Sequence, residues 1–469
     1  MRIEHDLLGQ REVPEDVYWG VHTLRAQENF NVSGYRQRPE LTCGLVQVKK
    51  ACAQANLEMG YLAKDKAKAI ITACDEIIEG KFHDQFVVDV FQGGAGTSAN
   101  MNANEVIANR AIELLGGKKG DYSIVHPNNH VNRHQSTNDV VPTAIRVALV
   151  GLFRKLPETV GELQKAFRRK ADEFSDVLKM GRTQHQDAVP MYLGDEFLAY
   201  SEVMKRDRQR LEACEPTLNR VNLGGTAIGT GIDAPIGFGQ LAIKKLNGNT
   251  GFSFFQARNL IDATQNIDAF AAVAAALKVH AANISKITSD LMLLHSGPST
   301  GFGEITLPDM QAGSSIMPGK VNPVIGEMVE QVAMQVISNE YVVCMVVRRG
   351  RLELNAFLPL LSHCLFESVI IMEAADRIFT ERMVSGIKAN REACAEHIRR
   401  GWLQAGLPAL VRHIGYCRAT EIGRIAKEQG KTPREVILSE GIFTEEELDR
   451  ILLCGLRGFG GEEEEIERQ

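Results

Sequence analysis

The sequence predicts a mainly α-helical protein built around a central bundle of long helices. It has only 15 prolines in 469 residues and few alternating β-branched stretches, and several long segments repeat apolar side chains at helical spacing. The clearest case is 261–294, where the run Ala269–Leu277 is apolar on every side of a helix. Such a helix must be surrounded by others, within one chain or across subunits.

Helical spacing recurs along the chain. In the first such segment, Val46, Ala53, Leu57 and Ile70 are among the apolar repeats. The last part of the chain has shorter helices, and Thr444 starts one with a glutamate three residues later, as in a capping box. The long segments are 41–81, 143–176, 195–221, 261–294, 324–347 and 360–388.

Composition excludes several classes of function. The chain is 44% hydrophobic and 24% charged, with a net charge of −6, which argues against a nucleic-acid surface. Its nine cysteines include no C-x-x-C pair, so neither a zinc site nor a redox dithiol is indicated. The odd cysteine count and the lack of a secretory leader predict a cytoplasmic protein. No segment reaches the roughly 18 apolar residues that span a bilayer, so no membrane partner is expected.

The most informative stretch is 313–324, which reads Gly-Ser-Ser-Ile-Met-Pro-Gly-Lys-Val-Asn-Pro-Val. Its glycines let backbone N–H groups approach a ligand and let a loop move. Lys320 offers a compact positive charge and Asn322 an amide donor, and both suit a carboxylate. The stretch therefore predicts a mobile loop that closes on a small anion and carries a candidate base. Taken alone, it could also be a plain connection between two helices.

Two further polar clusters precede helices. Residues 93–105 place glycines before a helix start, which makes an anion-binding concavity, but the Gly-Lys-Ser/Thr ending of a phosphate loop is absent. Residues 126–139 hold so many polar side chains that they need partners. His130 and His134 have helical metal-ligand spacing, yet no acidic third ligand follows, so no metal site is expected.

Two more clusters complete the set. Residues 181–190 read Gly-Arg-Thr-Gln-His-Gln-Asp-Ala-Val-Pro, and residues 224–231 read Gly-Gly-Thr-Ala-Ile-Gly-Thr-Gly. The second resembles a dinucleotide fingerprint but lacks the preceding strand and the acidic residue of a βαβ unit. Nucleotide binding is therefore not expected.

In this order, the clusters resemble the aspartase/fumarase superfamily over nearly the whole chain. Residues 313–323 resemble its signature, and 11–14 and 20–26 are similar to aspartate ammonia-lyases more than to class II fumarases. The resemblance implies three domains and a homotetramer whose active sites each take residues from three subunits. It implies a small dicarboxylic amino-acid substrate and no cofactor. The expected domains are N-terminal 1–136, central helical-bundle 137–390 and small C-terminal 391–469.

The resemblance implies a C–N lyase that converts L-aspartate to fumarate and ammonia. That elimination needs a base for the proton beside a carboxylate and donors for the resulting enediolate. By resemblance Ser314 is the catalytic base, acting as an oxyanion that N–H groups and Lys320 stabilise. Family positions suggest Thr97, Ser136, Thr137 and Ser315 for the β-carboxylate, Lys320, Asn322 and Thr183 for the α-carboxylate, and Asn138 for the amino group.

Gln184 helps to predict which group leaves the substrate, ammonia or water. Fumarases resemble this chain but carry a histidine at this position, and glutamine cannot titrate, which favours ammonia over water. Departures from the aspartase pattern at Ser299, at Leu358 and in 397–402 keep a modified or N-substituted aspartate open as the substrate. Fumarate hydration is a further alternative, as is a catalytically silent relative that keeps only the fold. Retention of Ser314 and Lys320 argues against the silent relative.

Overall fold

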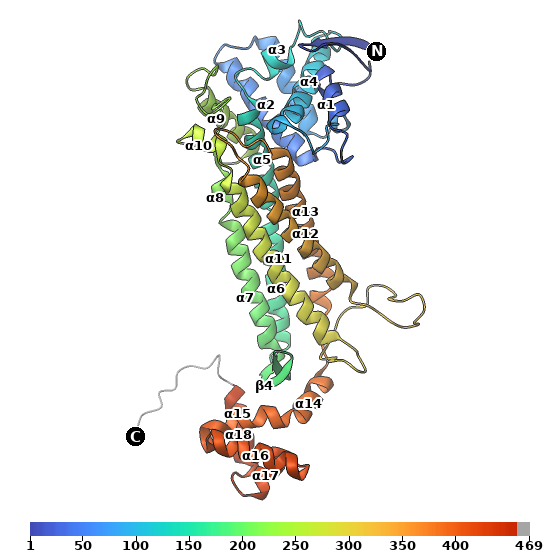
Figure 1. The fold of residues 1–469 in the computed structure, drawn as a ribbon, viewed down its shortest axis with the longest axis vertical. Coiled ribbons are helices and arrows are strands. Elements are labelled where there is room, and N and C mark those ends of the chain that lie inside the picture. Colours follow the sequence, from blue (N-terminus) through green and yellow to red (C-terminus); the bar gives the residue numbers. More distant parts are fainter. Residues whose placement is uncertain (457–469) are drawn as a thin grey trace. The chain divides into compact units, whose positions relative to one another are not determined.

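The computed structural model describes residues 1–456, without the side chains of 402–406, 409, 449 and 452–456. This part of the chain is mainly helical (Figure 1), as predicted, and its strands form four two-stranded sheets. The chain divides into two compact units made of separated stretches. The predicted three-domain boundaries stay a prediction. Unit 1 comprises Met1–Val160, Arg206–Ile284 and Gln331–Ala375; unit 2 comprises Gly161–Lys205, Ser285–Glu330 and Asp376–Gln469.

Long helices form the predicted bundle and contribute residues to both units. The predicted segment 324–347 matches α12, whereas 41–81 and 143–176 are each two helices. The first pair is separated around Gly60, whose φ of 78° lies in the left-handed region. Apolar spacing continues across such breaks, so it cannot reveal them. The long helices are α6 (Leu156–Glu173), α7 (Leu193–Glu212), α11 (Asp268–His295), α12 (Val324–Val347) and α13 (Leu358–Arg382).

In unit 1, the helix α2 is the centre of packing. It lies against α3, α5 and α9, and its buried residues include Leu45, Val46 and Val48. A second set of buried apolar residues joins α3 to α4. The other elements of unit 1 include β1 (Arg2–Asp6), β2 (Gly9–Val13), α1 (Val21–Asn29), α2 (Pro39–Glu58), α3 (Lys64–Ile78), α4 (Thr97–Leu114), the π-helix η3 (Pro127–Val131), α5 (Thr137–Phe153), α8 (Glu215–Leu218), β5 (Arg220–Val221), α9 (Phe238–Thr250), β6 (Phe255–Gln256) and α10 (Leu260–Gln265).

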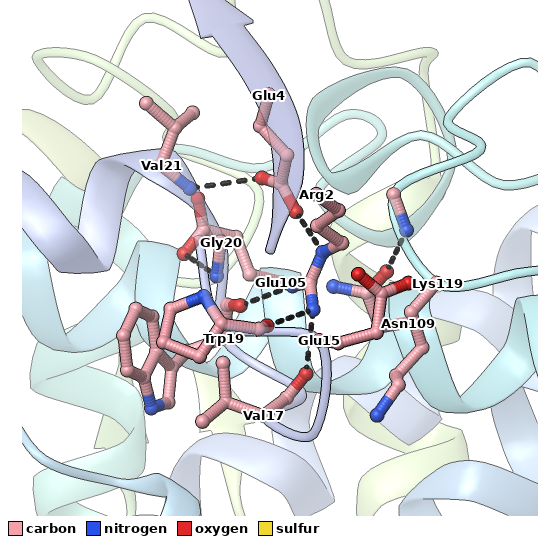
Figure 2. Close-up of polar contacts among 12 residues, drawn as sticks. Arg2, Glu4, Glu15, Val17, Trp19, Gly20, Val21, Glu105, Asn109 and Lys119 are labelled. Carbon is pink, nitrogen blue, oxygen red and sulfur yellow. Dashed lines mark hydrogen bonds and ion pairs between the residues drawn. The ribbon is translucent and has the colours of Figure 1, made fainter. Parts of the chain in front are cut away.

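Buried carboxylates anchor the N-terminal segment to α4 (Figure 2). Glu105 of α4 accepts hydrogen bonds from Gly20 N (2.8 Å) and Thr23 Oγ1 (2.6 Å), at the N-terminus of α1. Beside it, Glu4 Oε1 lies 2.7 Å from Arg2 Nε. A Cβ on Gly20 would lie 2.5 Å from Glu4 Oε2 and 2.9 Å from Glu105 Cδ, so only glycine fits between the two carboxylates. These contacts fix α4, whose first residue, Thr97, is a predicted site residue.

In unit 2, aromatic side chains hold the bundle helices together. Phe167 of α6 has its ring centroid 5.6 Å from that of Tyr200 on α7 and 6.1 Å from that of Phe379 on α13. A separate apolar core joins the small helices α15 to α18. The other elements of unit 2 are β3 (Leu178–Thr183), β4 (Gln186–Tyr192), β7 (Ile305–Thr306), β8 (Lys388–Ala389), α14 (Arg391–Arg400), α15 (Trp402–Ile414), α16 (Tyr416–Gln429), α17 (Pro433–Ser439) and α18 (Glu445–Leu456).

One helical stretch in the described residues, Leu358–Gly386, is long and apolar enough to cross a membrane by length and composition alone. The sequence prediction concerned an unbroken run of roughly 18 apolar residues, and Glu367 and Glu373 interrupt this stretch. In the structure, 61% of the apolar window is buried, as in the core helix of a bundle.

Candidate active site

Unit 1 brings together four of the predicted site residues, at the N-termini of α4 and α5. Thr97 is the first residue of α4, and its hydroxyl donates to Gly94 O. Ser136 is the N-cap of α5, and its Oγ accepts a hydrogen bond from Asn138 N at 3.2 Å. Thr137 begins α5 and is half-buried. Two helix N-termini that present hydroxyl groups are suited to binding a carboxylate.

Direct contacts join these two helix starts to each other and to the polar cluster 224–231. Asn100 Nδ2 of α4 lies 3.2 Å from Thr137 Oγ1. The amide of Asn138 donates to Ala227 O at 2.7 Å, which ties α5 to the loop 224–231. The clusters 93–105, 126–139 and 224–231, which are separate in the sequence, therefore meet within unit 1.

Asp139 organises this region and was not predicted as a site residue. Its Oδ1 accepts from Ser136 N, and its Oδ2 accepts from Gly224 N and Thr226 N, each at 3.0 Å. Burial raises the pKa of Asp139 to about 6, although the three N–H donors act in the opposite direction. The spacing Ser136-x-x-Asp139 is that of a capping box, and it was the available sequence signal.

In unit 2, Thr183 and Gln184 lie on the tight turn between β3 and β4. Thr183 pairs with Gln186, so Gln184 and His185 form a two-residue loop. Their φ values of 53° and 61° are both left-handed, which is the geometry of a type I′ hairpin. Neither residue is glycine or asparagine, so the turn is strained. Thr183, Gln184 and His185 are exposed in the single chain.

The loop 311–323 also belongs to unit 2 and is closed at its base. Ala312 pairs with Val321 in a short bridge, and Gly313 N donates to Lys320 O at 2.8 Å. Asn322 Nδ2 donates to Gly313 O at 2.9 Å, so in this conformation a predicted substrate ligand braces the loop. Ser315 and the tip residues of the loop are exposed. The loop is thus held together at its base and exposed at its tip.

The hydroxyl of Ser314 lies close to backbone N–H groups of its own loop. Its Oγ accepts hydrogen bonds from Ile316 N at 3.2 Å and from Met317 N at 2.9 Å. Donors directed at an oxygen favour its ionised form and so lower the free energy of an alkoxide. This agrees with the prediction that backbone N–H groups would support Ser314, whose role as base stays a prediction.

A buried ion cluster stands behind the β3–β4 hairpin. Glu304 is fully buried, with Oε1 2.7 Å from Arg182 Nη1 and 2.8 Å from His397 Nδ1, and Oε2 3.1 Å from Lys179 Nζ. Burial alone would raise the pKa of Glu304, but the charge of Lys179 and hydrogen bonds from His397 and Arg182 hold it below its usual value. The cluster thus fixes the strand that ends at Thr183. The sequence did not predict this ion cluster because its members are far apart along the chain.

Replacing Glu304 by glutamine is expected to destabilise the hairpin region by about 3 kcal/mol, because Lys179 and Arg182 would lose a buried counter-charge. Amide hydrogen exchange in β3 and β4 should become about 10²-fold faster. Glu196→Gln is the matched control. It also pairs with Lys179, at 2.7 Å, but its side chain is 22% exposed, so a loss of about 1 kcal/mol is expected. Equal acceleration in both variants would contradict the central role of Glu304.

The two histidines with metal-ligand spacing face separate partners. His130 Nδ1 accepts from His126 N at 2.8 Å, whereas His134 Nδ1 lies 2.7 Å from Asn56 Oδ1. Among the residues with described side chains, no group of three or more His, Cys, Asp or Glu is arranged to hold a metal ion.

Comparisons with known proteins found matching families and relatives. Residues 9–338 match the protein family described as Lyase, and residues 408–454 match the family described as Fumarase C C-terminus. Aspartate ammonia-lyase of Escherichia coli is 49% identical over 96% of this chain and 95% of its own length. That of Bacillus subtilis is 48% identical over 96% of this chain and 94% of its own length.

Solved structures agree. A Brucella melitensis structure described as fumarate lyase:delta crystallin bound to cobalt has a TM-score of 0.92 and 47% identity, over 96% of this chain and 98% of that one. A class II fumarase from Schistosoma mansoni has a TM-score of 0.93 but 31% identity, with the same coverages.

The fold, the polar clusters and these matches define a lyase, and the chain belongs to the aspartase/fumarase superfamily. Within it, the relatives given above at 48–49% identity are aspartate ammonia-lyases, well above the 31% of the class II fumarase. The resemblance to this superfamily, which was predicted from residues 313–323 and from the N-terminal stretches 11–14 and 20–26, is confirmed.

Proposed function

We propose that this protein eliminates ammonia from L-aspartate to give fumarate. The observation that carries the choice of substrate is 48–49% identity to aspartate ammonia-lyases over 96% of the chain. Gln184 supports it, because a side chain that cannot titrate suits an amine leaving group better than water.

In the proposed mechanism, Ser314 Oγ removes a proton from the carbon beside the β-carboxylate. Two N–H donors already point at that oxygen, at 2.9 and 3.2 Å. The electron pair left on carbon spreads into the β-carboxylate as an enediolate, and the C–N bond then breaks as the double bond of fumarate forms. Negative charge grows on the β-carboxylate, so donors placed there stabilise the transition state more than the substrate.

The predicted ligands divide between the two carboxylates of the substrate. Hydroxyl groups are proposed for the carboxylate that becomes the enediolate, and the loop cation Lys320 for the other carboxylate. The proposed β-carboxylate ligands are Thr97, Ser136, Thr137 and Ser315; the α-carboxylate ligands are Lys320, Asn322 and Thr183; Asn138 is proposed to lie near the amino group, and Gln184 is a further substrate-binding residue.

The protein is proposed to act as a cytoplasmic homotetramer with active sites shared among three subunits. Support comes from α12, where Met334, Ile337, Tyr341 and Met345 recur at helical spacing and are 37–66% exposed. A stripe of this kind on a bundle helix is the surface that copies of the chain would cover.

Tyr341→Glu is expected to split the assembly and to lower turnover by at least about tenfold, because a charge would be buried in the subunit contact. Sedimentation velocity measures the assembly, and Tyr416→Glu is the matched control, since Tyr416 is 75% exposed and belongs to α16 of the other compact unit. A Tyr341→Glu protein that stays tetrameric and active would contradict the placement of the interface.

Comparison of kcat/KM for L-aspartate, L-malate and an N-substituted aspartate tests the substrate assignment. L-Aspartate should exceed the other two by at least about 10²-fold, the ratio expected of a site that hydrogen-bonds the group which distinguishes them. Preference for the N-substituted compound would move the assignment to a modified aspartate, for which the departures at Ser299 and Leu358 leave room. Preference for L-malate would favour the hydratase.

A further inference from the structure

A lysine without a carboxylate partner lies buried behind the start of α5. Lys49 of α2 is fully buried, and its Nζ lies 3.3 Å from Asn132 Oδ1 and 3.4 Å from Gln135 Oε1. Both distances are long for a charged donor. Among the described residues Lys49 forms no ion pair. An ammonium in such a place lowers the stability of the fold, which favours a functional reason for its retention.

Side-chain amides connect this ammonium to the proposed substrate site. Asn132 Oδ1, which accepts from Lys49, lies 3.3 Å from Asn100 Nδ2, and the same Asn100 nitrogen lies 3.2 Å from Thr137 Oγ1. Lys49, Asn100 and Asn104 all donate to Asn132 Oδ1, so the ammonium acts on Asn100 through the position of this shared acceptor. The chain of contacts therefore ends on a hydroxyl at the N-terminus of α5, where the helix dipole has the same sign.

The nearest acidic group is already engaged. Asp139 lies on α5, and both of its oxygens accept backbone N–H groups at 3.0 Å, from Ser136, Gly224 and Thr226. Its charge is thus balanced mainly by peptide dipoles, and the charge of Lys49 remains available to an anion bound at Thr137.

We propose that Lys49 is a positioning residue for the elimination: acting through Asn132 and Asn100, its buried ammonium holds Thr137 and supplies positive potential to the carboxylate that becomes the enediolate. This inference rests on the proposed function. The enediolate carries more charge on that carboxylate than the substrate does, so the effect is larger in the transition state. Loss of the charge should therefore lower kcat more than it raises KM.

The charge on Lys49 also predicts a pH dependence. Burial lowers the pKa of Lys49 to about 8, so the ammonium is present below that pH and is lost above it. The groups that face it are Cys52 on α2, Cys74 on α3 and Asp139 on α5. Burial raises the pKa of both thiols, to about 12 for Cys74, and that of Asp139 to about 6. Lys49 is thus the member of this group that titrates near pH 8.

The test compares Lys49→Met with Lys50→Met. Lys50 is the next residue on α2 and pairs with Asp75 at 2.6 Å, with its side chain only 18% exposed. With L-aspartate, Lys49→Met should lower kcat by roughly 10- to 100-fold, remove the fall in kcat above pH 8, and leave the melting temperature unchanged or raised. Lys50→Met should keep the wild-type kcat and pH profile.

Binding of succinate, a dicarboxylate that cannot eliminate, tests Lys49 without any turnover. By calorimetry, Lys49→Met should bind succinate at least about fivefold more weakly than Lys50→Met below pH 8, and the two should converge above it. Equal affinities in the two variants, or equal kcat values, would overturn the role of Lys49. If the succinate affinities of the two variants differ as predicted but the wild-type protein does not turn over L-aspartate, the proposed function is contradicted and the role of Lys49 is still supported.

Discussion

Replacing Ser314 by alanine is expected to lower kcat with L-aspartate by about 10³-fold or more. General acid–base catalysis typically contributes about 10²–10⁴-fold to the rate. The reason is that no other group in the loop 311–323 has an oxygen held by two N–H donors, as Ser314 Oγ is at 2.9 and 3.2 Å. KM should change little, because the hydroxyl acts on the proton rather than on the carboxylates. Steady-state kinetics on protein of unchanged oligomeric state gives the measurement.

Alanine at 314 also removes an acceptor from the turn, so a second variant is needed. Ser314→Asn keeps a side-chain oxygen that can accept the N–H groups of Ile316 and Met317, as in an Asx-turn, but has no hydroxyl. Both variants should be inactive if the hydroxyl is the base. Activity in Ser314→Asn with loss only in Ser314→Ala would show that the residue shapes the loop and that the base is another group.

Lys320→Met is expected to lower kcat/KM by about 10²–10³-fold, with KM raised because the α-carboxylate loses its counter-charge and kcat lowered because the Ser314 oxyanion loses a stabilising charge. The main chain of Lys320 closes the loop base through the hydrogen bond from Gly313 N, and a side-chain change leaves that bond in place. Methionine keeps most of the length of the side chain and removes its charge. Kinetics over a range of aspartate concentrations separates the two parameters.

Lys388→Met is the matched control for Lys320→Met, since Lys388 is an exposed lysine of the same unit. It should keep wild-type kcat/KM. Lys320→Arg should recover part of the loss, since it restores charge with a different geometry. If Lys320→Met raised KM no more than Lys388→Met, the loop cation would not bind the substrate.

The sequence predicted those parts of the fold that depend on local pattern. The helix 324–347 was placed to the residue because its apolar spacing is unbroken and Pro323 precedes it. The break at Gly60 was missed because the spacing continues beyond it. The clusters around Thr97 and Ser136 were recognisable from composition, but their meeting through Asn100 is a tertiary contact that spacing cannot show.

Buried charges were the hardest features to predict. Glu304 joins strands and a helix from three distant parts of unit 2, so no local motif marks it. Lys49 did leave a signal, because Leu45, Cys52 and Ala53 place it on the apolar face of α2. The ammonium of a lysine at that position either reaches solvent at the end of its long side chain or has a function in the interior. Only the packing distinguishes the two cases.

The central claim is tested most directly by following fumarate and ammonia in one sample of the purified protein with L-aspartate. The account predicts that both products appear at the same rate and in equal amounts, and that neither appears with the Ser314→Ala protein. Absence of fumarate from L-aspartate, or fumarate formed from L-malate without ammonia, would contradict it.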